Sequence, residues 1–163
     1  MSFPVHFISW GSGQNALYAY LSMPFIAVFG LDVFSVRIVN LIFSLITVVA
    51  VYFMIKTFKN KKTAFIAMAL TAASPWNIML ARWGLESNLF PAFFVLSLWA
   101  LLLSTKKAHF VYLAAVLMAL SLYSYGAAYL VISIFGFICF FYFLFARLVK
   151  ARYGVLYFKY SQI

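Results

Sequence analysis

The chain has 163 residues, of which 67% are hydrophobic and only 9% are charged, and its mean hydropathy is +1.06. A water-soluble domain has about 45–50% apolar and about 25% charged residues, so this composition excludes a soluble fold and indicates an integral membrane protein. The formal net charge of +10 also raises the alternative of a nucleic-acid-binding protein, which depends on where the cations lie.

The first fifteen residues, MSFPVHFISWGSGQN, have neither a basic start nor a long apolar core, so they do not resemble a signal peptide. We expect an external loop over residues 1–15. Residues 16–30 are apolar but include Pro24, and they fall short of the roughly 20 residues that a helix needs to cross a bilayer. A helix lying in the membrane interface is favoured there over a span.

The rest of the chain is predicted to form transmembrane helices, because backbone groups in a bilayer must be paired internally and the alternation typical of strands is absent. Residues 33–57 are the first span. The second begins near residue 62 and is interrupted at Pro75, which biases Ser74 away from helix, so that 76–85 is a short re-entrant or interfacial piece. Three further spans and a basic tail follow, over residues 87–104, 108–123, 126–147 and 148–163.

The predicted fold class is therefore all-α: one polytopic membrane helix bundle over residues 1–163, with about five transmembrane helices between 33 and 147 and an interfacial helix. No internal repeat and no long linker divides it.

The charges are distributed unevenly between the connecting segments. With five spans, one side receives ten cations, and the other receives Asp32, Arg37, Arg82 and Glu86, which sum to zero. The ten are Lys56, Lys59, Lys61, Lys62, Lys106, Lys107, Arg147, Lys150, Arg152 and Lys159. The positive-inside rule places them in the cytoplasm of a multi-pass protein of the plasma membrane. A bacterial source is expected. The net charge is then a topology signal, and no nucleic-acid partner is predicted.

Polar residues gather on the predicted external side, and polar groups at membrane depth commonly mark a substrate path. Arg82 and Glu86, four residues apart, allow two interpretations. They can form an exposed helical ion pair worth about 0.2–0.5 kcal/mol, or Arg82 can offer its planar guanidinium to a lipid phosphate while Glu86 holds it in place. The candidate substrate-binding residues are Gln14, Asn15, Tyr18, Arg82, Glu86, Asn88, Tyr123 and Tyr125.

Some of these candidates have plainer explanations. Tyr123 and Tyr125 suit the aromatic belt of a membrane interface, and Gln14 and Asn15 are common loop residues. The single cysteine, Cys139, lies in an apolar segment and favours neither a disulfide framework nor a metal site. No zinc-protease, nucleotide-binding or Ser/His/Asp pattern is present, so no metal and no cofactor is predicted.

Three segments together resemble a known family. SWGSGQNALYAYLSMPFIAVFGLDVFSVRIVNLIFSLITVVAVYFMIK, ALTAASPWNIMLARWGLESNLFPAFFVLSLWALLL and LSLYSYGAAYL follow one another as in bacterial membrane glycosyltransferases of the GT-C fold. These glycosyltransferases, family 39-like, are related to protein O-mannosyltransferases and to the lipid A aminoarabinose transferase. The resemblance covers about residues 8–145.

The resemblance implies transfer of a sugar from a polyprenyl-phosphate carrier to a lipid, glycan or protein acceptor on the external face. It also implies a general-base carboxylate in the first external loop, which is expected upstream of Met1, so this sequence is interpreted as an N-terminal fragment that lacks turnover alone and contains no catalytic residue. Many relatives carry Lys-Pro-Pro where Gln14-Asn15-Ala16 stand here. Gln14 is neutral, so the phosphate contact of that lysine is expected to move to Arg82.

Two other functions remain open at this stage. A transporter or lipid flippase would require charges or broken helices at mid-depth on a transport path. A non-catalytic membrane subunit would tolerate replacement of the external polar cluster by Ser and Ala.

Overall fold

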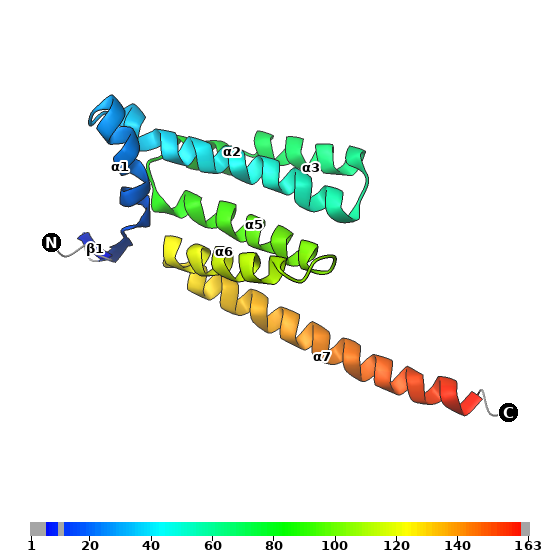
Figure 1. Ribbon diagram of the computed structural model, residues 1–163. Helices are drawn as coiled ribbons and strands as arrows, with labels where there is room; N and C mark the ends of the chain where they lie inside the picture. The colour runs from blue at the N-terminus through cyan, green and yellow to red at the C-terminus, as the bar shows by residue number, and fades with distance from the viewer. Residues whose placement is uncertain (1–5, 10–11, 161–163) are drawn as a thin grey trace. The chain divides into compact units, whose positions relative to one another are not determined.

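The computed structural model describes the backbone of residues 6–9 and 12–160 and the side chains of residues 15–145. It divides into two compact units, Met1–Ala128 and Tyr129–Ile163, each described by itself. Figure 1 shows a predominantly helical chain. Over the described residues the α-helices are α1 (Leu17–Phe29), α2 (Val33–Phe58), α3 (Lys61–Ala73), α4 (Pro75–Arg82), α5 (Leu89–Ser104), α6 (Phe110–Ser124) and α7 (Ala128–Tyr160).

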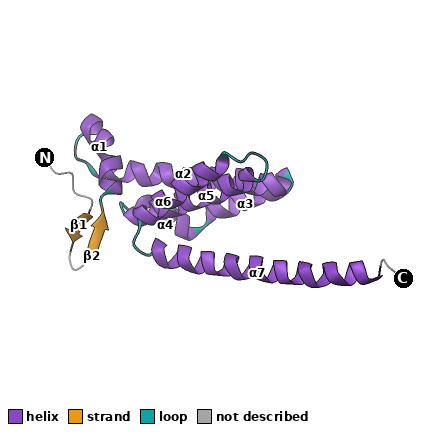
Figure 2. Cartoon of the chain, turned by 60° about the horizontal axis from the view of Figure 1, so that its bottom comes forward, coloured by secondary structure: helices purple, strands orange, loops and turns teal. Residues whose placement is uncertain are grey.

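The segment expected to be a loop contains a small β-hairpin before α1. Strands β1 (His6–Ser9) and β2 (Ser12–Asn15) pair antiparallel, with His6 opposite Asn15 and Ser9 opposite Ser12 (Figure 2). The sequence predicted an external loop over residues 1–15 and did not predict the pairing of two short strands within it. Four-residue strands are too short for periodicity in the sequence to reveal them, and they satisfy backbone groups of a segment with few apolar residues. The bundle that follows is all-α, as predicted.

Helix α1 occupies the segment predicted to be an interfacial helix. Its 13 residues correspond to a length of about 20 Å, less than the ~30 Å hydrocarbon core of a bilayer. The helix ends at Phe29 and is capped by Gly30, whose φ of 80° is a left-handed value that glycine adopts without a Cβ clash. The Gly30 N–H donates to the Ile26 carbonyl at 2.9 Å. That α1 lies in the interface stays a prediction.

Proline produces the break predicted after α3. Ser74 is extended (φ −62°, ψ 123°), Pro75 begins α4, and α3 and α4 are bent by 54°. Proline suits the first turn of a helix because the missing N–H has no partner there, and it moves the preceding residue out of the helical region. At the start of α3, the side chain of Asn60 caps the helix by accepting from the Thr63 N–H at 2.8 Å.

Small residues bring the helices of the first unit close together. Alanines at 50, 64, 92, 100 and 114 are each at most 6% exposed, and Ser97 and Ser121 are fully buried. The hydroxyl of Ser97 on α5 also donates a hydrogen bond to the sulfur of Met118 on α6, at 3.8 Å. In a membrane the helices gain little from hydrophobic burial, so close approach over small residues provides the packing energy.

Helices α2 and α5 run parallel. Asn88 at the start of α5 bonds to Asn40 near the start of α2, and Trp99 in the second half of α5 donates to Thr57 near the end of α2 at 3.1 Å. Loops α2–α3 and α5–α6 therefore lie at the same end of the unit.

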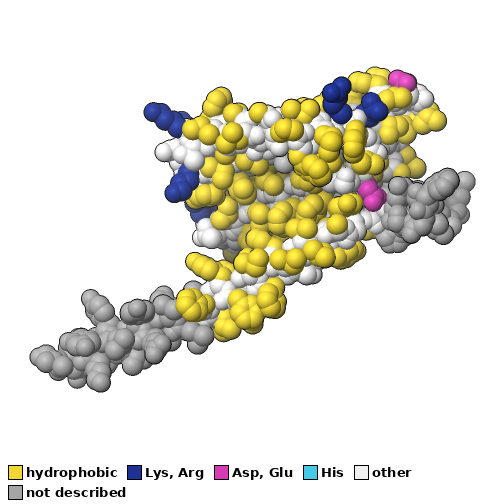
Figure 3. Space-filling model, turned by 180° about the vertical axis from the view of Figure 1, so that it is seen from behind, with side chains coloured by type: hydrophobic (Ala, Val, Ile, Leu, Met, Phe, Trp, Pro, Cys, Tyr) yellow, Lys and Arg dark blue, Asp and Glu magenta, His cyan; other side chains and the backbone are white. Residues whose placement is uncertain are grey.

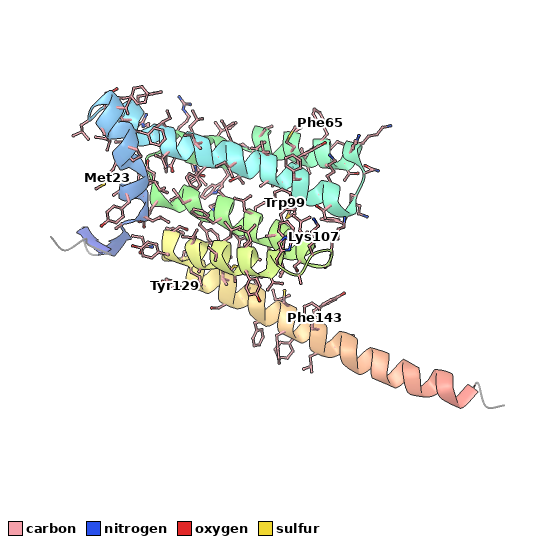
Figure 4. All side chains as sticks on the ribbon, viewed as in Figure 1. Met23, Phe65, Trp99, Lys107, Tyr129 and Phe143 are labelled. Atoms are coloured by element: carbon pink, nitrogen blue, oxygen red, sulfur yellow. The ribbon has the colours of Figure 1, made fainter. Side chains whose placement is uncertain are left out.

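Large apolar side chains cover the outside of this unit. Leu70 is 68% exposed and Phe65, labelled in Figure 4, is 60% exposed. Figure 3 shows the hydrophobic side chains extending along the helices, with cations gathered at the two ends. This is the surface that a lipid environment requires and water disfavours.

Three described helices are long and apolar enough to cross a membrane, over Val33–Phe58, Glu86–Ser104 and Ala128–Phe145. The bent pair Lys61–Ala73 and Pro75–Arg82 makes a fourth if it is counted as one span. Helix α6, predicted to be a fifth, has only 15 residues, so its crossing stays a prediction. The described segments thus form the predicted membrane helix bundle.

The second unit is formed by α7. Its described side chains are largely exposed and apolar, such as Phe143 at 66%. The helix continues to Tyr160, whereas the sequence predicted a span ending at 147 and a separate tail. The 33 residues correspond to about 50 Å, longer than a bilayer core, so the helix can leave the membrane without a break. The side chains of its basic end lie outside the described residues. Whether the chain forms one domain stays a prediction.

Candidate functional site

The charges of the first unit separate to its two ends. We call the end with Lys56, Lys59, Lys61, Lys62, Lys106 and Lys107 the lysine end, and the opposite end, with Asp32, Arg37, Arg82 and Glu86, the arginine end. The parallel course of α2 and α5 brings the six lysines in and beside the α2–α3 and α5–α6 loops to the same end. Figure 3 shows both carboxylates at the arginine end. The six lysines are therefore separated in space from Asp32, Arg37, Arg82 and Glu86, as the order of charges along the sequence predicted.

Asn40 organises the arginine end from within α2. Its side chain is fully buried, and its amide nitrogen donates to the carbonyl of Leu85 at 2.8 Å and also to the carbonyl of Trp83. Its own backbone carbonyl accepts from the side-chain amide of Asn88 at 2.7 Å. These bonds attach the α4–α5 connection to α2. The side-chain oxygen of Asn40 is buried and accepts no hydrogen bond from the described residues.

A second polar contact places α4. Ser44, one turn after Asn40, donates to the side-chain oxygen of Asn77 at 3.0 Å. Both Ser44 and Thr47 are buried. Asn40, Ser44 and Thr47 therefore form a buried polar stripe on the face of α2 that meets α4 and its loop. Polar bonds between helices are available in a bilayer because water does not compete for them.

Arg82 and Glu86 are not a helical ion pair, and that interpretation was wrong. Helix α4 ends at Arg82, Trp83 is extended (φ −93°, ψ 136°), and Glu86 begins a separate short 3₁₀ helix, η1 (Glu86–Asn88). A spacing of four residues brings side chains together only when the helix continues between them. Glu86 instead accepts the backbone N–H of Asn15 at 2.7 Å.

Glu86 and Tyr18 fix the chain segment that enters α1. The Glu86 contact joins residues 71 apart, and the Tyr18 hydroxyl donates to the Val36 carbonyl on α2 at 2.5 Å. Burial raises the pKa of Tyr18 above its ordinary value of 10.0, and the nearby Arg37 partly offsets this, so the phenol stays protonated and can donate. Gly84 packs against the Tyr18–Val36 contact. A Cβ at Gly84 would be 3.2 Å from the Val36 side chain and 3.4 Å from the Tyr18 hydroxyl.

Two open pockets lie on the surface of the arginine end. One, of about 550 Å³, is lined by Arg37 on α2 and by Pro75, Ile78, Met79, Arg82 and Trp83. The other, of about 460 Å³, is lined by Leu31, Asp32, Val33, Val36, Arg37 and Gly84. Arg37 is common to both. One pocket thus has two guanidinium groups without a carboxylate in its lining, which suits an anion such as a phosphate.

The other candidate residues are placed as follows. Asn88 supports the fold of the loop rather than lining either pocket, since its amide bonds to α2. Tyr123 and Tyr125 are half-buried at the end of α6, and α6 returns antiparallel to α5 toward the arginine end. They line neither of the two pockets. The side chain of Gln14 lies outside the described residues.

Three residues that support or line the site were not predicted to do so from the sequence. Asn40 was not singled out, and Arg37 and Asp32 were noted only as external polar residues. The signal for Asn40 was present: an amide inside an apolar span, with Ser44 and Thr47 four and seven residues further along. Among the described residues, no group of three or more His, Cys, Asp or Glu side chains could hold a metal ion.

Comparison with known proteins gives one finding at the level of family. The family described as dolichyl-phosphate-mannose-protein mannosyltransferase matches residues 15–158. Neither a curated protein nor a solved structure matches the chain. The family match begins within β2 and continues into α7, so it includes the arginine end and both of its pockets. The chain belongs to the dolichyl-phosphate-mannose-protein mannosyltransferase family, and is thus similar to membrane glycosyltransferases.

Proposed function

We propose that the chain is part of a glycosyltransferase that moves a sugar from a polyprenyl-phosphate donor to a lipid, glycan or protein acceptor on the extracytoplasmic side of the plasma membrane. The observation that carries the proposal is the pocket lined by both Arg37 and Arg82. The family supports sugar transfer as the class of reaction.

The pocket suits the phosphate of such a donor for electrostatic reasons. As the sugar is transferred, the phosphate leaves with additional negative charge, and positive groups held in place beforehand stabilise that charge. Arginine presents a planar set of N–H donors that match phosphate oxygens. Arg37 is carried by α2 and Arg82 by the last turn of α4, which the Asn77–Ser44 bond attaches to α2.

The apolar helices beside the pocket suit the isoprenoid chain of the donor. Met79 and Ile78 line the pocket with the arginines, and Ile78 is 47% exposed. A donor can therefore place its phosphate at the arginine end while its hydrocarbon chain stays in the bilayer.

The orientation in this proposal follows the positive-inside rule, with the lysine end in the cytoplasm and the arginine end outside. The role assigned to this chain is to bind the donor phosphate. The general base, which removes the proton from the acceptor, is not assigned to any of its residues. Gln14, Asn15, Glu86, Tyr123 and Tyr125 remain proposed contacts for the sugar or its carrier.

The test measures binding of a polyprenyl phosphate to the chain in lipid nanodiscs. Arg82→Ala and Arg37→Ala should each weaken binding by about tenfold or more, as expected for loss of a charge-assisted hydrogen bond. Lys62→Ala, which removes a cation at the opposite end, is the control and should leave binding unchanged. Unchanged binding in both arginine variants, or an equal loss in Lys62→Ala, would overturn the assignment.

A further inference from the structure

A third pocket lies on the outside of the first unit, away from the arginine end. Its volume is about 380 Å³, and its exposed surface is almost entirely apolar. Helix α2 contributes Leu45, Val49 and Phe53 among others, and α5 contributes Leu96 and Trp99. Leu45 and Val49 are 58% and 48% exposed, so the groove opens to the medium around the helices.

The length of the groove along α2 matches the thickness of one leaflet of a bilayer. Its lining on α2 extends from Ile42 to Phe53, which corresponds to about 16 Å along the helix axis. The hydrocarbon core of a bilayer is ~30 Å thick, so one leaflet accounts for about half of that. The groove ends near the last two turns of α2, where the lysine end begins. A hydrocarbon chain from the leaflet at the lysine end would therefore have the right position.

A lysine stands at the mouth of the groove. The ammonium of Lys56 lies 5.5 Å from the centre of the Tyr52 ring and 5.9 Å from that of Phe53. Phe53 lines the groove and stacks on Trp99 with a centroid distance of 5.4 Å and an interplanar angle of 19°. Trp99 is in turn held by its bond to Thr57. Figure 4 shows Trp99 on α5 near the loop that carries Lys107. The Lys56 ammonium therefore lies beside Phe53, one of the two stacked aromatic residues that line the groove.

Among the described residues, no acidic side chain lies at the lysine end beside this cation. The chain has only two acidic residues, Asp32 and Glu86, and both belong to the arginine end. A ligand that combines a negative headgroup with a hydrocarbon chain would satisfy Lys56 and the groove at once. A zwitterionic lipid would supply the chain without the net charge.

We propose that the groove between α2 and α5 is a binding site for an anionic phospholipid, with one acyl chain against Val49, Phe53 and Trp99 and the phosphate at Lys56. The phosphate position at Lys56 is at the opposite end of α2 from the donor pocket, and the site does not depend on the proposed glycosyltransferase function. The occupant is a component of the membrane leaflet at the lysine end.

The test uses quenching of Trp99 fluorescence by brominated acyl chains. A protein with Trp99 as its single tryptophan, made by changing Trp10, Trp76 and Trp83 to Phe, is reconstituted in phosphatidylcholine vesicles. Brominated phosphatidylglycerol or brominated phosphatidylcholine is then added at matched mole fractions. The proposal predicts that the anionic lipid reaches half-maximal quenching at about one fifth of the mole fraction that the zwitterionic lipid needs, since a lysine near the surface contributes about that factor.

Matched variants distinguish a site from a general attraction of anionic lipid to six lysines. Lys56→Gln should remove most of the preference, whereas Lys62→Gln, an identical charge change at the same end, should retain it. Val49→Phe, which fills the groove, should weaken quenching by the anionic lipid, and Leu41→Phe, on the exposed surface outside the groove lining, should not. Circular dichroism confirms that each variant keeps its helices.

Three results would overturn the proposal. They are equal quenching by the two lipids in the single-tryptophan protein, an equal loss of preference in Lys56→Gln and Lys62→Gln, and undiminished quenching in Val49→Phe. The second result would identify a diffuse electrostatic attraction, and the third would place the acyl chain elsewhere.

Discussion

The side-chain amide of Asn88 donates a 2.7 Å hydrogen bond to the backbone carbonyl of Asn40, 48 residues earlier in the chain. This bond is buried and joins the start of α5 to α2. In the other direction, the side-chain amide of Asn40 donates a hydrogen bond to the carbonyl of Leu85, in the loop before η1. Together the two asparagines hold the segment that carries Arg82 and Glu86.

Replacement of Asn40 by leucine should destabilise the protein. The change keeps the volume of the side chain but leaves the carbonyls of Trp83 and Leu85 without their donor. We expect the free energy of unfolding to fall by about 1–3 kcal/mol, measured by titration with dodecyl sulfate in mixed micelles. Ser104→Ala is the control, because that exposed hydroxyl donates only within its own helix, to Leu101. Unfolding of Asn40→Leu at the wild-type detergent fraction would contradict this role.

A side chain at Gly84 should separate α1 from the loop. A Cβ there would approach Val36 to 3.2 Å and the Tyr18 hydroxyl to 3.4 Å, and a valine adds two further methyl groups. We expect Gly84→Val to cost about 1–3 kcal/mol of stability through overpacking, measured by the same titration. Gly126→Val is the matched control, since nothing lies within 4 Å of a Cβ at Gly126. Equal effects of the two substitutions would show that the contact at Gly84 has no influence.

Loss of the Glu86 carboxylate should expose the Asn15 amide. Glu86 accepts that N–H at 2.7 Å, so Glu86→Ala should accelerate its hydrogen exchange by about tenfold, as expected for a lost hydrogen bond to a charged group. Asp32→Ala removes the only other acidic side chain in the sequence, which makes no capping bond at α2. This control should leave exchange at Asn15 unchanged. An unchanged exchange rate of the Asn15 amide in Glu86→Ala would contradict this role of Glu86.

Much of the fold was predictable because the bilayer imposes a few strong constraints on sequence. The span over α2 followed from an apolar length that no soluble fold requires, and the bend after α3 followed from Pro75. The separation of lysines from the arginine end followed from counting charges between spans. These features depend on local composition, which the sequence displays directly.

The site was less predictable because it depends on contacts between distant segments. Arg82 and Glu86 have the spacing of a helical pair, but α4 ends between them, and Glu86 meets a residue 71 positions away. The hairpin before α1 and the continuation of α7 to Tyr160 were missed for a similar reason, since weak local preferences decide short strands and helix ends. Asn40 was within reach, because a buried amide in a membrane helix requires a partner.

The central claim is that the lysine end and the arginine end face opposite sides of the membrane. It is tested by labelling single cysteines at Leu85→Cys and Thr105→Cys with a membrane-impermeant maleimide, in intact cells, after Cys139→Ala removes the native thiol. Both positions are exposed, one at each end. The account predicts that Cys at 85 reacts from outside, and that Cys at 105 reacts only after the membrane is permeabilised. Reaction of both positions from the same side would contradict it.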